Sequence, residues 1–150
     1  MARLAVLAVG VALTLVALGG VATAGTGGRP LSTPMTGAEE APGPGDANAS
    51  GQADLRLNQG RERLCFDLTW TDIDGTVFAA HVHRGDVGVA GPIVAPLFEG
   101  TFAGTDAASG CVDVEKSLVK AIRKDPSAYY VNVHSLPGFP AGAIRGQLGD

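Results

Sequence analysis

The sequence predicts a mainly β domain, an antiparallel sandwich of about seven or eight strands with one short helix. Three observations carry this prediction. Short runs of alternating polar and apolar residues recur along the chain, Gly and Pro separate these runs, and one segment has helical spacing. Short strands at such regular spacing are typical of a sandwich.

The N-terminal 24 residues are typical of a secretory signal peptide. Arg3 precedes an apolar stretch over residues 4–18, and Ala22-Thr23-Ala24 is a small-x-small cleavage site. The stretch is shorter than the roughly 20 apolar residues that a membrane-spanning helix needs. We therefore expect a secreted, extracellular protein with no membrane span after cleavage.

The predicted mature chain begins with residues 25–32, which are rich in Gly, Thr, Arg, Pro and Ser. This composition predicts a flexible lead-in. Residues 33–150 then form the folded domain, which has the ordinary size of a single domain.

A hairpin is expected early in the domain. Residues 52–58 alternate polar and apolar side chains, and residues 64–70 repeat the pattern after a turn at Gly60. Further strands are expected at residues 76–83, 93–98, 111–114, 129–134 and 143–148, each beside a loop rich in Gly or Pro.

One segment departs from the strand pattern, over residues 115–124. Leu118 and Ile122 are four residues apart with Val119 beside them, and Asp125-Pro126 follows. This spacing predicts a short amphipathic helix ended by proline. We expect it to lie across one end of the sandwich.

Cys65 and Cys111 are the two cysteines of the chain. An even number in an exported protein favours a disulfide between them, with two buried thiols as the alternative. The formal net charge of −4 suggests neither a nucleic-acid partner nor an anionic membrane surface.

The three histidines fall in two strand-like runs. His81 and His83 alternate along one run, so they share a face about 7 Å apart, and His134 ends the other run. Three imidazoles of this kind suit copper or zinc if the two runs are neighbours, which the sequence does not decide. The alternative is ordinary half-buried histidines that bond to the backbone.

Four further residues are candidates to support such a site. Tyr130 and Asn132 share a face with His134 and are candidates to orient an imidazole, unless they are plain strand residues. Arg145 is the single charge of the last strand. It is a candidate to pair with Asp86 or Asp67, or to attract an anion beside a metal. A structural salt bridge or a loop clamp is the favoured interpretation.

The order of these pieces resembles the CHRD (chordin-type) domain family. The matching motifs are residues 35–42 (MTGAEEAP), 64–68 (LCFDL), 80–85 (AHVHRG), 91–94 (GPIV), 110–112 (GCV), 129–134 (YYVNVH) and 139–148 (FPAGAIRGQL). The resemblance covers nearly the whole predicted mature chain. It implies an extracellular, mostly β domain and no settled biochemical activity.

A second resemblance is to the copper site of copper/zinc superoxide dismutases. His81-Val82-His83 followed by Gly85-Asp86 is similar to the copper-binding strand there, and Val133-His134 is similar to a strand end carrying another copper ligand. Residues 141–146 resemble the segment with the arginine that guides the anion. The chain has no fourth histidine and no zinc-site histidines, which excludes a bimetallic centre. These resemblances imply an immunoglobulin-like or superoxide-dismutase-like Greek key.

Three functions are consistent with the sequence. The first is a secreted, non-enzymatic binding module whose loops or three-histidine face bind a metal, an extracellular protein or a cell-envelope component. The second is a copper-only redox enzyme in which Arg145 attracts superoxide. The third is a metal-free adhesion or scaffold protein. Copper is the favoured cofactor over zinc, and no catalytic residue is assigned.

Overall fold

The computed structural model describes residues 28–100 and 106–149. The predicted signal peptide and residues 25–27 lie outside this part of the chain. Within it, every paired strand runs antiparallel to its neighbours in one sheet. The strands are β1 (Arg29–Thr36), β2 (Ser50–Asn58), β3 (Arg63–Thr71), β4 (Thr76–Arg84), β5 (Ile93–Glu99), β6 (Ala107–Asp113), β7 (Tyr129–Leu136) and β8 (Phe139–Gln147).

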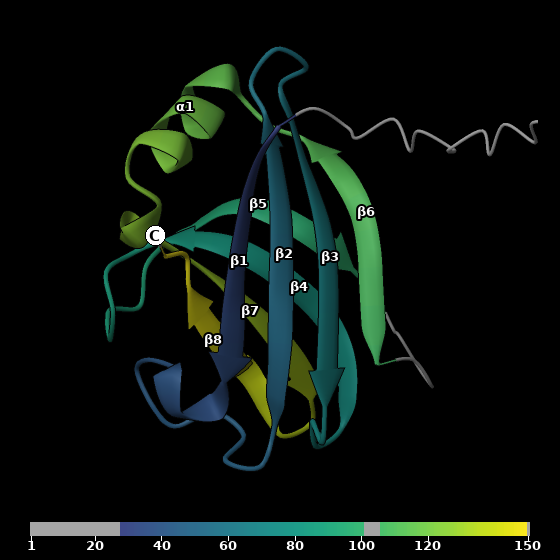
Figure 1. The fold of residues 1–150 in the computed structure, drawn as a ribbon. Helices are drawn as coiled ribbons and strands as arrows, with labels where there is room; N and C mark the ends of the chain where they lie inside the picture. Colours follow the sequence, from purple (N-terminus) through teal and green to yellow (C-terminus); the bar gives the residue numbers. More distant parts are fainter. Residues whose placement is uncertain (1–27, 101–105, 150) are drawn as a thin grey trace, which may run out of the picture.

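The sheet bends into two layers that face each other (Figure 1). One layer contains β1, β2, β3 and β6, and the other contains β5, β4, β7 and β8. The layers join where Thr36 of β1 pairs with Arg145 of β8. At the opposite side, the edge strands β5 and β6 face each other across a gap, which we call the seam. The predicted all-β sandwich is confirmed.

The strand order also confirms a Greek key. Taken across the seam, the order is β3-β6-β5-β4. The consecutive strands β4, β5 and β6 therefore lie side by side, while β3 lies beside β6, which is a Greek-key arrangement. The connections from β3 to β4 and from β6 to β7 cross between the layers.

The core lies between the two layers. The predicted hairpin is β2–β3, and Leu55 pairs with Phe66 at its centre. Its alternate side chains point inward and are buried. Val131 and Val133 of β7 and Ile144 of β8 meet them from the other layer.

The outer face of β7 is buried as well, although it points away from the core. All residues from Tyr129 to Ser135 are buried. The segment over residues 85–92 covers this face, because Arg145 donates hydrogen bonds to its backbone carbonyls. The segment over residues 37–46 covers it at the other end, where the Asp46 N–H bonds to the Ala143 carbonyl at 2.8 Å. Polar side chains on this face are therefore enclosed.

The flexible lead-in predicted for residues 25–32 is wrong from Arg29 onward. Residues 29–36 form β1, which pairs with β2 over its whole length. Pro30 contributed to this expectation, because proline cannot donate a ladder hydrogen bond. Pro34 lies further along the same strand. The two prolines are four residues apart, so both nitrogens face one edge of the strand. That edge pairs with β8 only at Thr36, so few ladder bonds are lost.

The helix α1 (Lys116–Lys124) is confirmed within the predicted segment. It lies across one end of the sandwich (Figure 1) and buries Val119 and Ile122. Among the residues that the structure describes, no helix is long and apolar enough to span a membrane. The strand before α1 begins at Ala107, earlier than the predicted residue 111.

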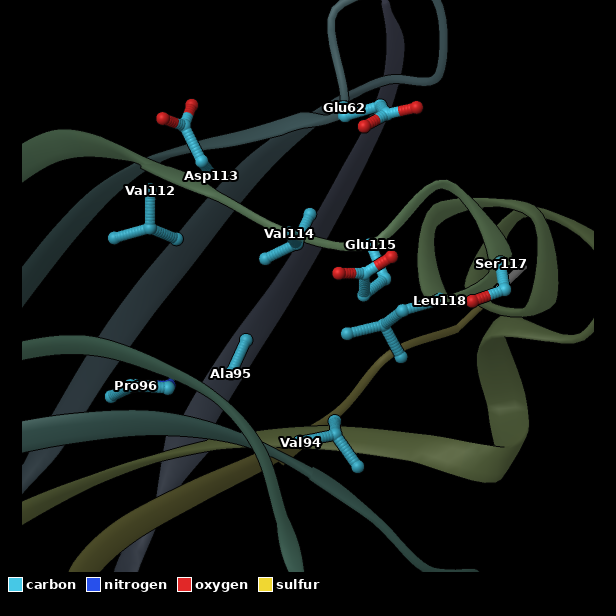
Figure 2. A pocket seen from close by; sticks show the side chains of 10 residues that line it. All are labelled: Glu62, Val94, Ala95, Pro96, Val112, Asp113, Val114, Glu115, Ser117 and Leu118. Carbon is cyan, nitrogen blue, oxygen red and sulfur yellow. The ribbon is translucent and has the colours of Figure 1, made fainter.

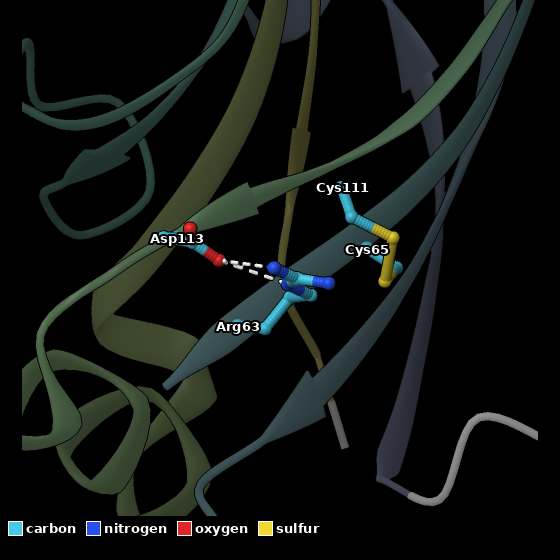
Figure 3. Close-up of a disulfide and its surroundings, with 4 residues drawn as sticks. All are labelled: Arg63, Cys65, Cys111 and Asp113. Atoms are coloured by element: carbon cyan, nitrogen blue, oxygen red, sulfur yellow. Dashed lines mark hydrogen bonds and ion pairs between the residues drawn. A yellow bond between two sulfur atoms is a disulfide. The ribbon is translucent and has the colours of Figure 1, made fainter. Parts of the chain in front are cut away.

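Cys65 and Cys111 form the predicted disulfide (Figure 3). The two residues are directly opposite each other on β3 and β6, so the bridge fastens the edge strand β6 to its one neighbour. The ion pair of Arg63 with Asp113, 2.8 Å long, lies next to it on the same two strands.

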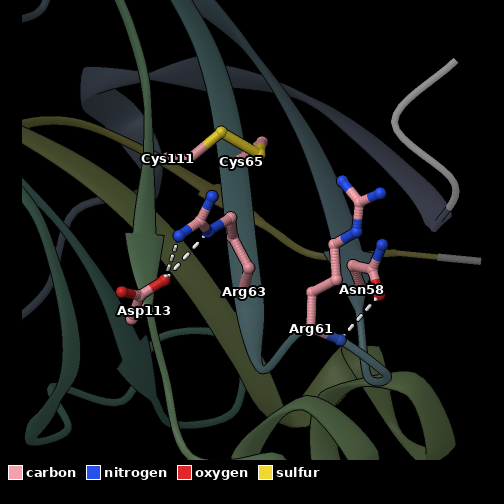
Figure 4. A network of polar contacts seen from close by, with 6 residues as sticks. All are labelled: Asn58, Arg61, Arg63, Cys65, Cys111 and Asp113. Atoms are coloured by element: carbon pink, nitrogen blue, oxygen red, sulfur yellow. Dashed lines mark hydrogen bonds and ion pairs between the residues drawn. A yellow bond between two sulfur atoms is a disulfide. The ribbon is translucent and has the colours of Figure 1, made fainter. Parts of the chain in front are cut away.

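The hairpin turn between β2 and β3 lies near the same end (Figure 4). There the Arg61 backbone N–H donates to Asn58 Oδ1 at 3.0 Å. This bond holds the turn closed where the two strands of the hairpin meet.

Candidate metal centre

Two neighbouring strands bring the three histidines together. His81 and His83 alternate along β4, and His134 lies on β7, which pairs directly with β4. The register places His81 opposite Asn132 and His83 opposite Tyr130. Because the side-chain period of a strand is two, all five side chains lie on the outer face of this layer. The fold thus makes β4 and β7 neighbours, which the sequence alone did not decide.

The three imidazoles form one compact cluster. One ring nitrogen of each histidine lies within 4.8 Å of the others, so the three side chains could hold a single ion. His81 Nδ1 is 2.9 Å from His134 Nε2. The three residues are 7%, 8% and 6% exposed, in chain order. The site is therefore a nearly enclosed set of three nitrogen donors.

The outer nitrogens of two of these rings are fixed by backbone carbonyls. His83 Nδ1 is 2.9 Å from the Gly91 oxygen, and His134 Nδ1 is 3.1 Å from the Pro140 oxygen. A carbonyl can only accept, so each Nδ1 carries the proton. The Nε2 lone pairs of both rings then point into the cluster. Fixing the tautomer in this way is typical of metal-ligating histidines.

One nitrogen in the cluster lacks a partner. His83 Nε2 is buried and makes no hydrogen bond. His134 Nε2 lies 2.9 Å from Asn132 Oδ1, which is also an acceptor, and 2.9 Å from His81 Nδ1, which donates to it when it carries the His81 proton. A cation among these atoms would satisfy His83 Nε2 and replace the His81 proton at His134 Nε2, and so the residues present fit a metal ion.

The histidines are held neutral, the form that binds a metal. Burial, with the charges of His81 and His83 in support, lowers the pKa of His134 to about 4. Burial also lowers the pKa of His81, and the charge of His83 lowers it further. Burial lowers the pKa of His83 too, and there the charge of Arg145 adds to the effect. No proton has to be displaced from the Nε2 atoms of His83 and His134 at neutral pH.

His81 has an additional acidic neighbour. Its Nε2 lies 3.9 Å from Glu99 Oε1 on the adjoining strand β5. This distance is longer than a hydrogen bond, so the carboxylate does not fix the His81 tautomer.

The side chains of Tyr130 and Arg145 stack in succession beside the ring of His83. The rings of His83 and Tyr130 stack with centroids 4.7 Å apart, and the Arg145 guanidinium carbon lies 3.4 Å from the Tyr130 ring centroid. Arg145 donates to the backbone oxygens of Val89 and Asp86 at 2.9 Å and 2.8 Å. Tyr130 thus packs against the ring of His83.

Among the roles considered for Arg145, this placement is that of a loop clamp. The guanidinium contacts the backbone of Asp86 and not the predicted side chain, and Asp67 lies on β3 in the other layer. Arg145 is 1% exposed. A guanidinium buried in this way fastens the covering segment 85–92 to the sheet, and it presents no exposed charge to guide an anion.

Glu40 belongs to the same enclosed face and was missed in the sequence. Burial raises the pKa of its carboxyl from 4.5 to about 7, against the opposing charge of Arg145 and the hydrogen bonds from Ala41 and Asn132. Its carboxylate lies over Gly142, where a Cβ atom would come within 2.4 Å of it. Nothing in the sequence separates Glu40 from the exposed Glu39 beside it.

Glu40→Gln should stabilise the protein at pH 8 and leave it nearly unchanged at pH 5. The raised pKa means that the folded state keeps a neutral carboxyl up to about pH 7. Stability from this group is therefore full below pH 4.5 and lost as the pH rises through 7. Allowing for partial solvent screening, we expect a gain on the order of 2 kcal/mol at pH 8.

Urea unfolding of both proteins at the two pH values measures this difference. The titration of the histidines is common to both proteins and cancels in the comparison. Glu39→Gln, on an exposed neighbour, is the matched control and should change little at either pH. An equal gain at pH 5 and pH 8 would contradict the buried-carboxyl explanation.

The comparisons with known proteins agree with the motifs in the sequence. The CHRD domain family matches residues 31–148, which include every strand pair around the three histidines. No curated protein and no solved structure matches the chain. Because the family match spans more than half of the chain, the protein belongs to the CHRD domain family.

Proposed function

We propose that this protein is a secreted, non-enzymatic CHRD-domain binding module that holds one metal ion at His81, His83 and His134. The observation that carries the proposal is the convergence of three neutral imidazoles in which the buried His83 Nε2 has no hydrogen-bond partner. A buried polar atom without a partner is rare in folded proteins, and a bound cation would supply one.

The donor set favours copper. Imidazole nitrogen suits copper and zinc, and the general order of affinity places Cu(II) above Zn(II) for such ligands. No carboxylate belongs to the cluster among the described residues, which argues against Ca²⁺ and Mg²⁺. The signal peptide predicted at the N-terminus supports export of the protein.

Burial supports a binding role over a redox enzyme. A catalytic metal keeps an open position that solvent and substrate reach. The three histidines are 6% to 8% exposed, and Arg145 is 1% exposed. These values favour a closed site.

The segment over residues 85–92 supports contact with a partner. Val87 and Val89 on it are 74% and 51% exposed. Exposed apolar residues on a segment that the metal site holds in place are suited to an extracellular protein or a cell-envelope component. A bound metal would then hold residues 85–92 in the conformation that presents Val87 and Val89 to the partner.

Isothermal titration of the chelator-stripped protein with Cu(I), Cu(II) and Zn(II) tests the metal site. We expect one-to-one binding, tightest for copper. His83→Gln should weaken metal binding by about 100-fold, because the loss of a residue that only orients a metal ligand already has an effect of that order. Binding should be absent in the triple variant His81→Ala/His83→Ala/His134→Ala.

Arg84→Gln, on the exposed residue after His83, is the control and should bind like the wild type. Circular dichroism checks that each variant is folded. Wild-type affinity in a folded triple variant, or no binding of any of the three ions, would contradict the proposal. A metal-free adhesion or scaffold protein would then be the better description.

A further inference from the structure

The seam between β5 and β6 is closed at one end. Phe98 of β5 packs against Phe66 and Trp70 of the opposite layer, with ring centroids 6.3 Å apart in both pairs. The aromatic side chains fill the space between the layers there. From this end the two edge strands continue toward α1 without a comparable cluster.

At the other end the seam opens into a groove of about 700 Å³. The start of β5 forms one side of it, and the end of β6 with the beginning of α1 forms the other (Figure 2). Its floor is apolar, formed by Val94, Ala95, Val112, Val114 and Leu118. A cavity of this size with an apolar lining is in the range of ligand-binding sites.

The groove has a free strand edge on each side. Among the residues that the structure describes, β5 pairs only with β4, and β6 pairs only with β3. The backbone N–H and C=O groups on the open edges are available to another strand. Pro96 removes one donor from the β5 edge. The edge of β6 is therefore the better template for an added strand.

The rim of the groove is acidic. Glu62, Asp113 and Glu115 border it, and the carboxylates of Glu62 and Asp113 lie at one rim in Figure 2. Asp113 is paired with Arg63. Among the described residues, the exposed Glu62 and Glu115 have no ion-pair partner. Two unpaired carboxylates above an apolar floor are complementary to a basic, apolar ligand.

We infer that this groove binds an extended peptide segment carrying lysine or arginine, which adds as a strand to the free edge of β6. Side chains alternate along an added strand. Its apolar side chains therefore contact the floor, while its basic side chains reach Glu62 and Glu115. This mode of recognition obtains affinity from main-chain hydrogen bonds and specificity from the alternate side chains. The inference does not depend on the metal site, which lies on the outer face of the other layer.

A nuclear magnetic resonance titration of the protein with the peptide acetyl-Val-Lys-Val-Arg-Val-amide tests the inference. We expect saturable shifts of backbone amides confined to residues 93–96 and 110–118. Replacing both basic residues of the peptide by Glu should abolish the shifts. Glu62→Gln/Glu115→Gln should weaken binding about fivefold, the combined effect of two exposed ion pairs.

The control Glu39→Gln/Asp67→Asn removes the same charge from exposed positions outside the groove, and it should leave the affinity unchanged. No shifts at millimolar peptide, equal binding of the acidic peptide, or shifts elsewhere would overturn the inference. Equal binding of hexylammonium at residues 93–96 and 110–118 would also overturn the inference, because that ligand has no peptide backbone and cannot add a strand. Self-association of the protein through β6 would make a second copy the occupant and would overturn it as well.

Discussion

Replacing both cysteines by alanine should lower the free energy of unfolding by about 4 kcal/mol. The disulfide joins residues 46 positions apart, and a cross-link of that span restricts the unfolded chain by about this amount in the chain-entropy description. The folded state also depends on the bridge, because β6 is an edge strand that pairs with β3 alone. The loss is a large part of the stability of a small domain.

Urea unfolding of Cys65→Ala/Cys111→Ala beside the wild type measures this loss. Hydrogen exchange should accelerate first in β6, and the outer face of β7 should keep its protection. Wild-type protein treated with a reducing agent provides the comparison without a change of sequence, and it should lose a similar amount. A loss below 1 kcal/mol would show that the strand pairing of β6 is sufficient without the bridge.

Arg145→Met should cost about 3 kcal/mol. The buried guanidinium donates three hydrogen bonds, to the oxygens of Val89, Asp86 and the Gln147 side chain. Hydrogen bonds to a charged group each contribute about 1.5–3 kcal/mol, and methionine retains only the packing against Tyr130. Part of the loss is recovered because the freed carbonyls near the surface bind water.

The effect of Arg145→Met should be concentrated in the segment that the arginine holds. Hydrogen exchange should become faster in residues 85–92, and urea unfolding should give the total loss. Arg84→Met, the same substitution at an exposed position at the end of β4, should change stability by less than about 0.5 kcal/mol. Similar losses in the two variants would show that burial of Arg145 contributes little.

The elements that follow a local pattern could be predicted from the sequence. The alternation in β2 and β3 gave the hairpin and its inward face, and the four-residue spacing of Leu118 and Ile122 gave α1. The start of β1 was missed because prolines such as Pro30 are typical of loops. They are tolerated there because the edge of β1 that faces β8 carries little pairing.

The candidate site was predicted in part. The two-residue spacing placed His81 and His83 on one face, and this follows from strand geometry alone. Their meeting with His134 depends on the pairing of β4 with β7, two strands separated by β5, β6 and α1 in the sequence. Single-sequence patterns do not encode such long-range pairing.

The groups that enclose the site could not be predicted at all. Glu40, the Gly91 carbonyl and the Pro140 carbonyl come from three separate parts of the chain, two loop segments and the start of β8, and the fold brings all three to one face. Two of these partners are backbone oxygens, which every residue has. Their role in fixing the histidine tautomers therefore leaves no signature in residue type.

The most direct test of the metal site is X-ray diffraction from copper-loaded crystals at the copper absorption edge. The anomalous difference map should contain one strong peak bonded to His81 Nδ1, His83 Nε2 and His134 Nε2. Asn132 and the carbonyl partners of the two Nδ1 atoms should stay in place. A peak at another position, or copper held by only one of the three histidines, would contradict the three-histidine centre.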